Sequence, residues 1–503
     1  MGFFHPFTND GGGGERVLWC AGSAPLHVLL VSLQLTRLTS YFAAHCQVCC
    51  PSAARLAARS AGACSPHTCT PPASSMFTPT RTLCRNAPTF NWQVYIFTGD
   101  DLTAEQLSER AATLFGVPPL RPVRTVRLLL RGLVLARLYP VFTLLGQSLG
   151  SMALALEALY KLTPALFVDT AGYAFAYPLA SAAGSKVASY THYPMVSTDM
   201  LAVVSNRAET FNNRAWVARS TMLSAVKASY YRLLASLYGS AGRCADVIMV
   251  NSSWTEGHIA EMWRVRPSIV YPPCDIESLK ALPLDRPAMP RIVISVAQFR
   301  PEKAHAQQLR AWAAVMQRAA ASEFAGRHAY LRGAKLVLVG GVRHAEDRER
   351  LDGLRAMAER LGIASDVDFQ TGIPAVQLRL LLASAHAGLH TMRDEHFGIS
   401  VVEYMAAGAV PIAHRSAGPA MDIVVPEAPG EPLPGRLCTS DNEYADALEE
   451  VLCMPEEERL GLAKLARDAS EEFTELQFTS DFVGALARVL PRSAVRRVST
   501  KEE

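Results

Sequence analysis

Short apolar runs rich in Val and Ile recur along the chain from residue 92 onward, and segments of helix length usually separate them. A continuous apolar run of this length is typical of a strand buried on both faces, as in parallel βαβ units. The runs predict a first series of strands at 92–100, 165–172, 186–194, 246–252 and 268–273. They predict a second series at 291–298, 334–341, 367–372, 387–392 and 410–414.

The two series are separated by Tyr271 to Pro290, where prolines accumulate and the hydrophobic period is lost, as in a linker. A chain of 503 residues is too long for one compact core, so two domains are expected. The predicted fold class is α/β, with two doubly wound Rossmann-like domains and a donor cleft between them. We expect an N-terminal domain over 1–280, a C-terminal domain over 281–475, and a C-terminal helix and tail over 476–503.

Composition places the chain among globular proteins, since 50% of its residues are hydrophobic and 19% are charged. A formal net charge of +3 is too small for a general nucleic-acid binder, so no nucleic-acid partner is expected. Arginines alternate with leucines and valines in Arg121 to Pro140, where no acid occurs. This pattern fits either a basic amphipathic segment on an anionic membrane surface or a core-facing helix or strand whose arginines face solvent.

Residues 21–90 interrupt the hydrophobic pattern with a stretch rich in Cys, Ser, Ala, Thr and Pro. The sequence Cys46-Gln-Val-Cys49-Cys50 has no matching His/Cys pair at zinc spacing, so no structural metal site is predicted here. We expect this window to be a disordered insertion or an artefact of the gene model, and not to belong to the fold.

Candidate chemistry lies at the ends of predicted strands, because ligands of doubly wound sheets bind beyond the carboxyl ends of the strands. The glycine run that contains Gly13 and Gly14 follows a strand-like start and opens a helix. It fits either a phosphate-facing loop or a flexible turn. His192 ends the predicted strand 186–194, where it could serve either a site or the core.

Two cations, Arg300 and Lys303, follow the predicted strand 291–298 in the sequence "VAQFRPEKAH". Positive charge at this position suits a diphosphate leaving group, on which negative charge builds as its bond breaks. A solvated turn is the plainer alternative, and the pattern favours the functional interpretation.

The stretch "RDEHFGISVVEYMAAG" places Glu395 and Glu403 on either side of an apolar run. We expect a helix that begins near Phe397 or Gly398 and ends at Ala407, with its first backbone N–H groups free to meet phosphate. A carboxylate can accept hydrogen bonds from two hydroxyl groups of a sugar. Carboxylates before the helix and on its flank, with phosphate between them, describe a site for a nucleotide-sugar.

These motifs resemble a known family. The spacing Glu395-x7-Glu403, with Phe397-Gly398 between, resembles the glutamate pair of retaining glycosyltransferases with the GT-B fold. "FRPEK" resembles the diphosphate-binding turn of that family, and "GGGGER" resembles its glycine loop. Longer stretches such as "DTAGYAFAYPL", "THYPMVSTDML" and "HTMRDEHFGISVVEYMAAG" are similar to the dolichol-pathway α-1,2-mannosyltransferases of asparagine-linked glycosylation. The similarity covers residues 2–20 and nearly all of 92–490.

The resemblance implies an enzyme that moves mannose from GDP-mannose onto a dolichol-pyrophosphate-linked trimannosyl oligosaccharide. It would add the fourth and fifth mannoses at the cytosolic face of the endoplasmic reticulum membrane. The implied partners are GDP-mannose, the dolichol-linked oligosaccharide, the membrane surface and other mannosyltransferases of the pathway. No cofactor and no metal are implied, since GDP-mannose is the donor substrate.

The resemblance also implies roles for single residues. Glu395 would hold the mannose hydroxyls and Glu403 the ribose hydroxyls, while Lys303 with Arg300 would neutralise the diphosphate. His192 would lie near the transferred sugar and the β-phosphate. The remaining donor-binding residues implied are Gly13, Gly14, His396, Phe397, Gly398 and Ile399.

The chain departs from the family pattern in several places. Gln298 stands where many relatives carry Arg, and Ala417-Gly418 replaces the usual double glycine. From its strand-like start, the chain is expected to begin inside a strand and to lack the hydrophobic N-terminal anchor usual in the family. Two other hypotheses are a glycosyltransferase of this fold with a different donor or a soluble acceptor, and a catalytically silent, membrane-associated scaffold.

Overall fold

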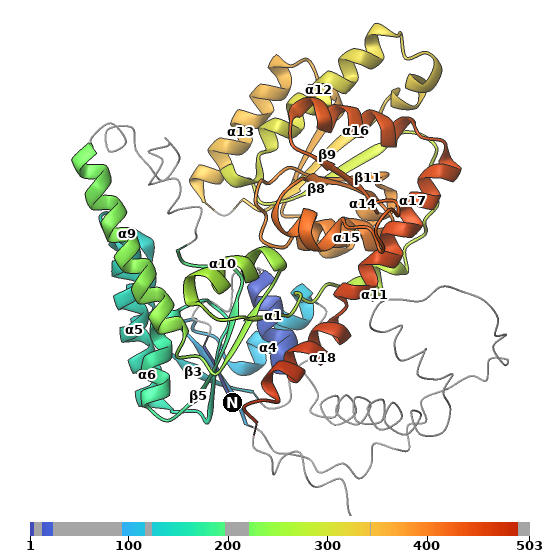
Figure 1. Cartoon of the computed structure of the whole chain (residues 1–503). Helices are drawn as coiled ribbons and strands as arrows, with labels where there is room; N and C mark the ends of the chain where they lie inside the picture. The colour runs from blue at the N-terminus through green and yellow to red at the C-terminus, as the bar shows by residue number, and fades with distance from the viewer. Residues whose placement is uncertain (5–12, 24–92, 116–122, 197–220, 343, 491–503) are drawn as a thin grey trace, which may run out of the picture. The chain divides into compact units, whose positions relative to one another are not determined.

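The computed structural model describes residues 1–4, 13–23, 93–115, 123–196, 221–342 and 344–490, and its strands form two parallel sheets (Figure 1). Residues 1–23 and 93–478 pack as one compact unit that contains both sheets. Residues 24–92 and 479–503 form a second unit, of which the described residues continue a helix to Leu486 and then a turn. Beyond its first residues, which lie in a helix, the predicted insertion 21–90 falls outside the described residues, as do its cysteines.

The first sheet has seven strands in the order β3-β2-β1-β4-β5-β6-β7, and every pairing is parallel. In that order the strands are β3 (Val123–Arg127), β2 (Val94–Thr98), β1 (Gly2–Phe4), β4 (Leu166–Asp169), β5 (Lys186–Thr191), β6 (Val247–Val250) and β7 (Ser268–Ile269). Its helices are α1 (Gly13–Ser23), α4 (Ala104–Phe115), α5 (Thr143–Lys161), α6 (Tyr177–Ala182), α9 (Thr221–Gly242) and α10 (Ser253–Trp263).

The second sheet has six strands in the order β10-β9-β8-β11-β12-β13, again all parallel. In that order the strands are β10 (Val367–Thr371), β9 (Lys335–Gly340), β8 (Ile292–Val296), β11 (Ala387–His390), β12 (Val410–His414) and β13 (Arg436–Cys438). Its helices are α12 (His305–Ala321), α13 (Ala345–Arg360), α14 (Ala375–Ser384), α15 (Ile399–Ala407), α16 (Asp441–Cys453) and α17 (Glu456–Ala469), followed by α18 (Glu475–Leu486).

Both sheets are doubly wound, because the strand order reverses in the middle of each one. Helices α5, α6 and α9 cover one face of the first sheet; α12, α13 and α16 cover one face of the second and α14, α15 and α17 the other (Figure 1). The order reverses between β1 and β4 and between β8 and β11, and ligands of such sheets bind at that point. The fold therefore directs attention to the loops after β8 and β11.

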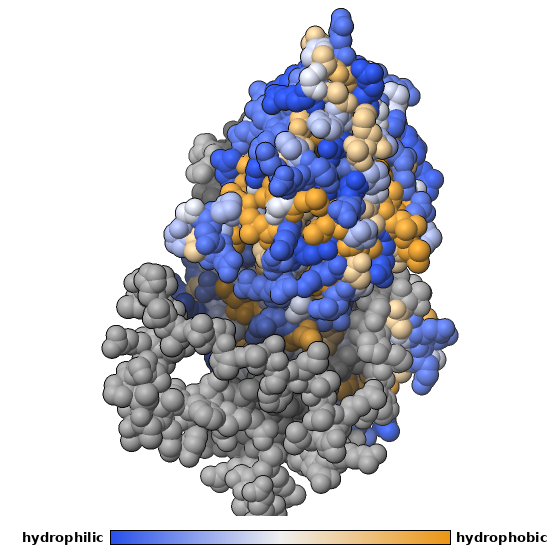
Figure 2. Space-filling model, turned by 90° about the vertical axis from the view of Figure 1, so that its right-hand side faces the viewer, coloured by the Kyte–Doolittle hydropathy of each residue, from blue (hydrophilic) through white to orange (hydrophobic). Residues whose placement is uncertain are grey.

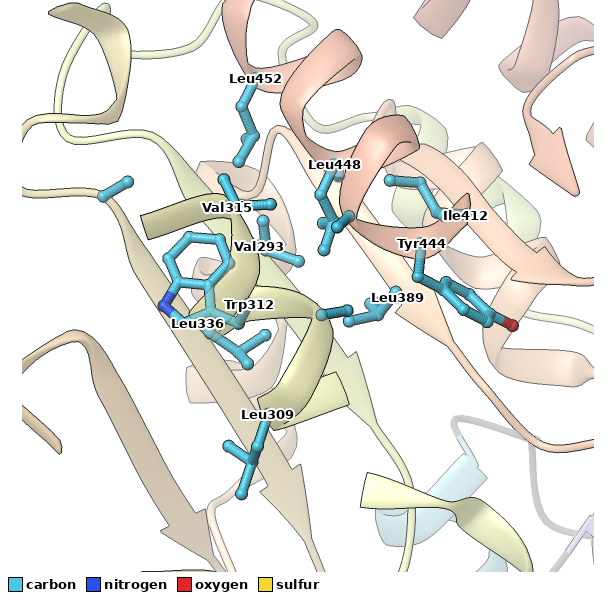
Figure 3. Packing of buried hydrophobic residues seen from close by; sticks show 14 of the residues in the cluster. Val293, Leu309, Trp312, Val315, Leu336, Leu389, Ile412, Tyr444, Leu448 and Leu452 are labelled. Atoms are coloured by element: carbon cyan, nitrogen blue, oxygen red, sulfur yellow. The ribbon is translucent and has the colours of Figure 1, made fainter. Parts of the chain in front are cut away.

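The core of the second sheet shows why its apolar runs form strands. Val293, Leu336, Leu389 and Ile412 are fully buried, one from each of four neighbouring strands. Trp312 of α12 lies over them together with side chains of α16 (Figure 3). Burying a large side chain in this way contributes about 1.5–3 kcal/mol to stability.

The predicted strands of both series are confirmed. The two sheets lie on either side of the predicted linker, and the domain limits at 280 and 475 stay a prediction. The linker nevertheless contains a short helix, α11 (Ile276–Lys280), because Ile276 and Leu279 pack into the core. Strand β13 was not predicted.

The arginine-rich segment is not one continuous amphipathic helix. It supplies the edge strand β3 and then two short 3-10 helices, η2 (Leu130–Val134) and η3 (Ala136–Leu138). Arg127 and Arg131 form ion pairs with Asp101 and Asp100. The interpretation as strand with arginines facing solvent therefore holds for its first half.

Polar residues cover much of the described surface on the face in Figure 2, and apolar residues gather there in separate patches. Within the described residues, no helix has both the length and the apolar character that crossing a membrane requires.

Candidate active site

A partly buried ion pair lies where the strand order of the second sheet reverses. Lys303 ends the turn after β8, and Glu395 belongs to the loop after β11. Their side chains meet at 2.5 Å between Nζ and Oε2, with 22% and 14% of each side chain exposed. Two motifs that lie 92 residues apart in the sequence thus converge on one point.

His390 adds a second polar group beside this carboxylate. Its Nε2 lies 3.1 Å from Oε2 of Glu395, although the contact lacks the geometry of a directed hydrogen bond. Burial alone would raise the pKa of Glu395, but the contact with His390 and the charge of Lys303 outweigh it. They hold the pKa of this carboxyl well below its usual range, so Glu395 is an ionised acceptor at neutral pH.

Thr391 fixes the position of Lys303 relative to β11. The Thr391 hydroxyl donates to the backbone carbonyl of Lys303 at 3.0 Å and accepts from the amide of Gln308 at 3.0 Å. Thr391 and Gln308 are both buried, so this link is shielded from water. The turn that carries Lys303 is therefore held against the end of the neighbouring strand.

The loop that carries Glu395 is held by the loop after β12. The Gly418 N–H donates to the Glu395 carbonyl at 3.0 Å, and the Asp394 N–H donates to the Ser416 hydroxyl at 2.8 Å. A Cβ on Gly418 would lie 2.4 Å from the carbonyl oxygen of Phe397, so this close approach needs a glycine. Asp394 itself takes a left-handed conformation, with φ of 56°.

Helix α15 begins next to the ion pair at Ile399, one or two residues after the predicted start, and ends at Ala407 as predicted. Gly398 precedes it with φ of 113°, and Gly408 ends it in a left-handed conformation. Within the described residues, the N–H groups of Gly398, Ile399 and Ser400 donate no hydrogen bond. Free N–H groups at a helix start attract an anion. The Phe397 side chain instead packs in the core against Tyr271 and Phe473, so only its backbone is suited to a ligand.

Glu403 lies inside α15 and interacts electrostatically with Arg16 of helix α1. Burial raises the pKa of Glu403, Arg16 opposes this effect, and Asp275 reinforces it. Arg16 is buried and forms an ion pair with Glu475 at 2.7 Å. Within the described residues the Glu403 carboxylate accepts no direct hydrogen bond, so its acceptor capacity is available to a ligand.

His192 and His396 lie among aromatic rings. The ring of His192, just after β5, lies edge-on to Tyr190 with centroids 4.9 Å apart. His396 stacks on Tyr193, the neighbour of His192, at 4.2 Å. Trp254 of α10 lies 5.2 Å from His396. Burial lowers the pKa of His396, and Glu395 partly opposes this. The ring stack thus brings the end of β5 to the loop of Glu395.

Other predicted residues are not drawn into the cluster. Within the described residues, the Arg300 side chain forms no hydrogen bond and no ion pair; its carbonyl accepts from the Lys303 N–H at 3.2 Å. Gly13 and Gly14 form the start of α1, and the glycines before them lie outside the described residues.

Sequence reasoning missed His390, Thr391 and Arg16. His390 and Thr391 lie at the carboxyl end of a strand that was predicted, and this position was itself a signal. Arg16 ends the sequence "GGGGER", but its electrostatic interaction with Glu403 joins distant parts of the chain, and no local pattern predicts it.

The geometry suits a sugar joined to a diphosphate. An ionised carboxylate can accept sugar hydroxyls, Lys303 and the start of α15 can meet phosphate oxygens, and Glu403 can accept a second polyol. Without a ligand, the ammonium group of Lys303 is paired with the carboxylate of Glu395. A diphosphate bound beside this pair could interact with the same ammonium group.

Sequence comparison finds two matching family profiles. Residues 1–28 and 76–263 match "ALG11 mannosyltransferase N-terminus", and residues 282–468 match "Glycosyl transferases group 1". The human GDP-Man:Man(3)GlcNAc(2)-PP-Dol alpha-1,2-mannosyltransferase is 39% identical over 495 residues, which are 97% of this chain and 87% of the relative. The Dictyostelium discoideum protein of the same name is 35% identical over 501 residues, covering 98% and 85%.

Solved structures share the two-sheet fold. The OtsA apo structure matches with a TM-score of 0.56 at 12% identity over 79% of this chain and 94% of that one. Anabaena Alr3699/HepE in complex with UDP and glucose matches with a TM-score of 0.53 at 15% identity over 97% and 98%. At such low identity these matches establish the fold alone, and they confirm the predicted GT-B architecture.

Proposed function

The chain belongs to the ALG11 family of group 1 glycosyltransferases, and from this membership we propose its reaction in full. It is a GDP-mannose-dependent α-1,2-mannosyltransferase that acts on the dolichol-pyrophosphate-linked trimannosyl oligosaccharide. It adds the fourth and fifth mannoses to this acceptor at the cytosolic face of the endoplasmic reticulum membrane. Other mannosyltransferases of the same pathway are its proposed neighbours there.

One observation carries the assignment of the site: the Lys303–Glu395 ion pair lies beside the open start of α15, where the strand order of the second sheet reverses. We assign the mannose hydroxyls to Glu395 and the diphosphate to Lys303 and the N–H groups of Gly398 and Ile399. His396 lies next to them on the same loop and contributes its backbone. Support comes from the ionised state of Glu395, which makes it a strong acceptor.

The ribose is assigned to Glu403, which is partly buried, accepts no direct hydrogen bond within the described residues and has Arg16 as its nearby cation. At 1.5 Å per residue, Glu403 lies about 6 Å along the helix from Ile399, close enough for phosphate at the helix start and ribose at Glu403 to belong to one nucleotide. Arg300 belongs to the same turn as Lys303 and is the second cation available to the diphosphate.

The proposed reaction retains the α configuration. The bond between the mannose anomeric carbon and the β-phosphate oxygen breaks, and an acceptor hydroxyl forms the new bond on the same face. The proton of that hydroxyl passes to the leaving phosphate, so atoms and charge balance with GDP as the second product. His192 and the glycine loop at Gly13 and Gly14 would line the reaction centre, and Lys303 would stabilise the negative charge that develops.

The division of roles between the two glutamates can be tested by GDP binding and mannosyl transfer in parallel. Glu395→Ala should abolish transfer and leave the affinity for GDP within about twofold, because GDP carries no mannose. Glu403→Ala should weaken GDP itself by roughly ten- to a hundredfold, the worth of a hydrogen bond to a charged group. Equal losses of GDP affinity in both variants would refute the assignment.

A further inference from the structure

Large apolar side chains are exposed along one side of α5 and continue onto α9. On α5 these are Leu145, Leu149, Leu156 and Tyr160. At 100° per residue, these four positions fall within about 60° of one another around the helix. The buried residues of α5, among them Leu154 and Ala158, lie on the opposite side. Helix α5 therefore has one apolar face in the core and a second one outside it.

The turn before α5 extends this outer face. Val141 and Phe142 are both exposed, and Phe142 takes a left-handed conformation with φ of 55°. A non-glycine residue pays a conformational cost of about 1–2 kcal/mol in that region. The Phe142 ring contacts Tyr230 of α9 at 5.2 Å between centroids, and the Tyr230 hydroxyl accepts from the Leu145 N–H at 3.2 Å.

The exposed apolar side continues on helix α9. Leu233 and Leu237 follow Tyr230 at helical spacing and are exposed, whereas Leu234 and Tyr238 are buried. Figure 1 shows α5 and α9 side by side. We call the exposed residues Val141, Phe142, Leu145, Leu149, Leu156, Tyr160, Leu233 and Leu237 the α5–α9 face.

Charge around the face is mostly positive. Glu157 and Lys161 of α5 neutralise each other in an ion pair. Apart from them, helices α5 and α9 carry two basic residues, Lys227 and Arg232, and no acid. Arg137, in η3 just before the turn, is exposed as well. Apolar groups flanked by cations are the combination that binds the interface of an anionic bilayer.

We infer that the α5–α9 face rests on a phospholipid membrane surface, with Val141 and Phe142 inserted among the acyl chains. This inference rests on the proposed function, because an acceptor linked to dolichol is held in a membrane and the enzyme must meet it there. A contiguous exposed apolar face of this kind is unusual on a water-facing surface and marks an interaction site. The membrane contact thus lies on the helices that follow the arginine-rich segment.

The test is binding of the full chain to vesicles, by co-sedimentation and by flotation. Phosphatidylcholine vesicles are compared with phosphatidylcholine vesicles that contain phosphatidylserine. The wild-type chain should bind both kinds, and more tightly the anionic ones, with an advantage that salt reduces. Val141→Glu combined with Leu149→Glu should lower the apparent partition coefficient at least about tenfold on both kinds.

The matched control is a pair on α14 of the second sheet. Val376 and Leu380 are 71% and 66% exposed, against 69% and 57% for Val141 and Leu149. Val376→Glu combined with Leu380→Glu adds the same charge at similar exposure and should leave vesicle binding unchanged. Apolar patches also reach the surface elsewhere, as Figure 2 shows, so this control separates the α5–α9 face from general stickiness.

Transfer to a short-chain acceptor in detergent, measured on the same proteins, separates this inference from the proposed function. Both double variants should keep wild-type transfer there, and the α5–α9 variant should lose it only with acceptor in vesicles. No transfer by wild-type protein would refute the proposed function while leaving the vesicle result standing. Equal vesicle binding by wild type and the α5–α9 variant would overturn the inference. The inference would also be overturned if the wild-type chain were a dimer and the α5–α9 variant a monomer, since a second copy would then cover the face.

Discussion

Replacing Glu395 by Gln should destabilise the protein, whereas the same change at Glu403 should not. Exposed ion pairs contribute about 0–1 kcal/mol, and breaking a fully buried pair costs about 3–5 kcal/mol. The Lys303–Glu395 pair lies between these cases, since 22% and 14% of its side chains are exposed. We therefore expect Glu395→Gln to lower the free energy of unfolding by about 2–3 kcal/mol.

Glu403 gives the opposite expectation because burial opposes its charge and raises its pKa. Within the described residues its carboxylate accepts no direct hydrogen bond, and Arg16 keeps its ion pair with Glu475 when Glu403 is neutral. Glu403→Gln removes a partly buried charge and leaves no described partner without its hydrogen bond. Stability should stay the same or rise slightly.

Urea unfolding at neutral pH, followed by circular dichroism, measures both changes. Lys303→Met and the double variant with Glu395→Gln complete a cycle that isolates the pair, with an expected coupling of about 2 kcal/mol. The folded pKa of Glu395 is depressed, so its contribution is present above the usual carboxyl pKa and is lost as pH falls through the folded value. Equal stability losses in the two Gln variants, or none at Glu395, would refute this reasoning.

Three further predictions concern pH, the core and the loop geometry. GDP affinity, measured by calorimetric titration, should fall as pH drops through the raised pKa of Glu403, because the ionised carboxylate accepts hydrogen bonds from both ribose hydroxyls. Glu403→Gln should abolish this pH dependence. Arg16→Met should move it to higher pH, because Arg16 lowers the pKa of Glu403. Trp312→Ala should cost about 3–5 kcal/mol of unfolding free energy in urea, since the indole is fully buried (Figure 3). Gly418→Ala should weaken GDP-mannose binding, measured by fluorescence or calorimetry, because its Cβ would lie 2.4 Å from the Phe397 carbonyl and push the Glu395 loop away; an unchanged affinity would show that the loop tolerates the shift.

Local pattern was sufficient for the strands and for α15. Runs such as 336–339 are continuous and apolar because such a strand is buried on both faces. The glycines at 398 and 408 supply the conformations at which α15 starts and stops. Strand β13 was missed because only Leu437 stands between Arg436 and Cys438, too little for a hydrophobic period.

The site was predictable in part. Lys303 and Glu395 were each recognised at the end of a strand, but their contact depends on β8 and β11 being neighbours, and strand order is a tertiary property. For the same reason Arg16 could not be connected with Glu403. The alternation of basic and apolar residues in 121–140 does not form a surface helix. Its first part is the edge strand β3. The exposed apolar face lies further on, because α5 carries one apolar stripe in the core and a second one outside it.

The central claim is tested most directly by giving the full chain one lipid-linked trimannosyl acceptor and a choice of donors. With GDP-mannose, we expect two mannoses to be added, both released by an α-1,2-specific mannosidase and both in α configuration by NMR. With UDP-glucose, no product should form. No transfer from GDP-mannose by folded protein that binds GDP, or faster transfer from UDP-glucose, would contradict the account.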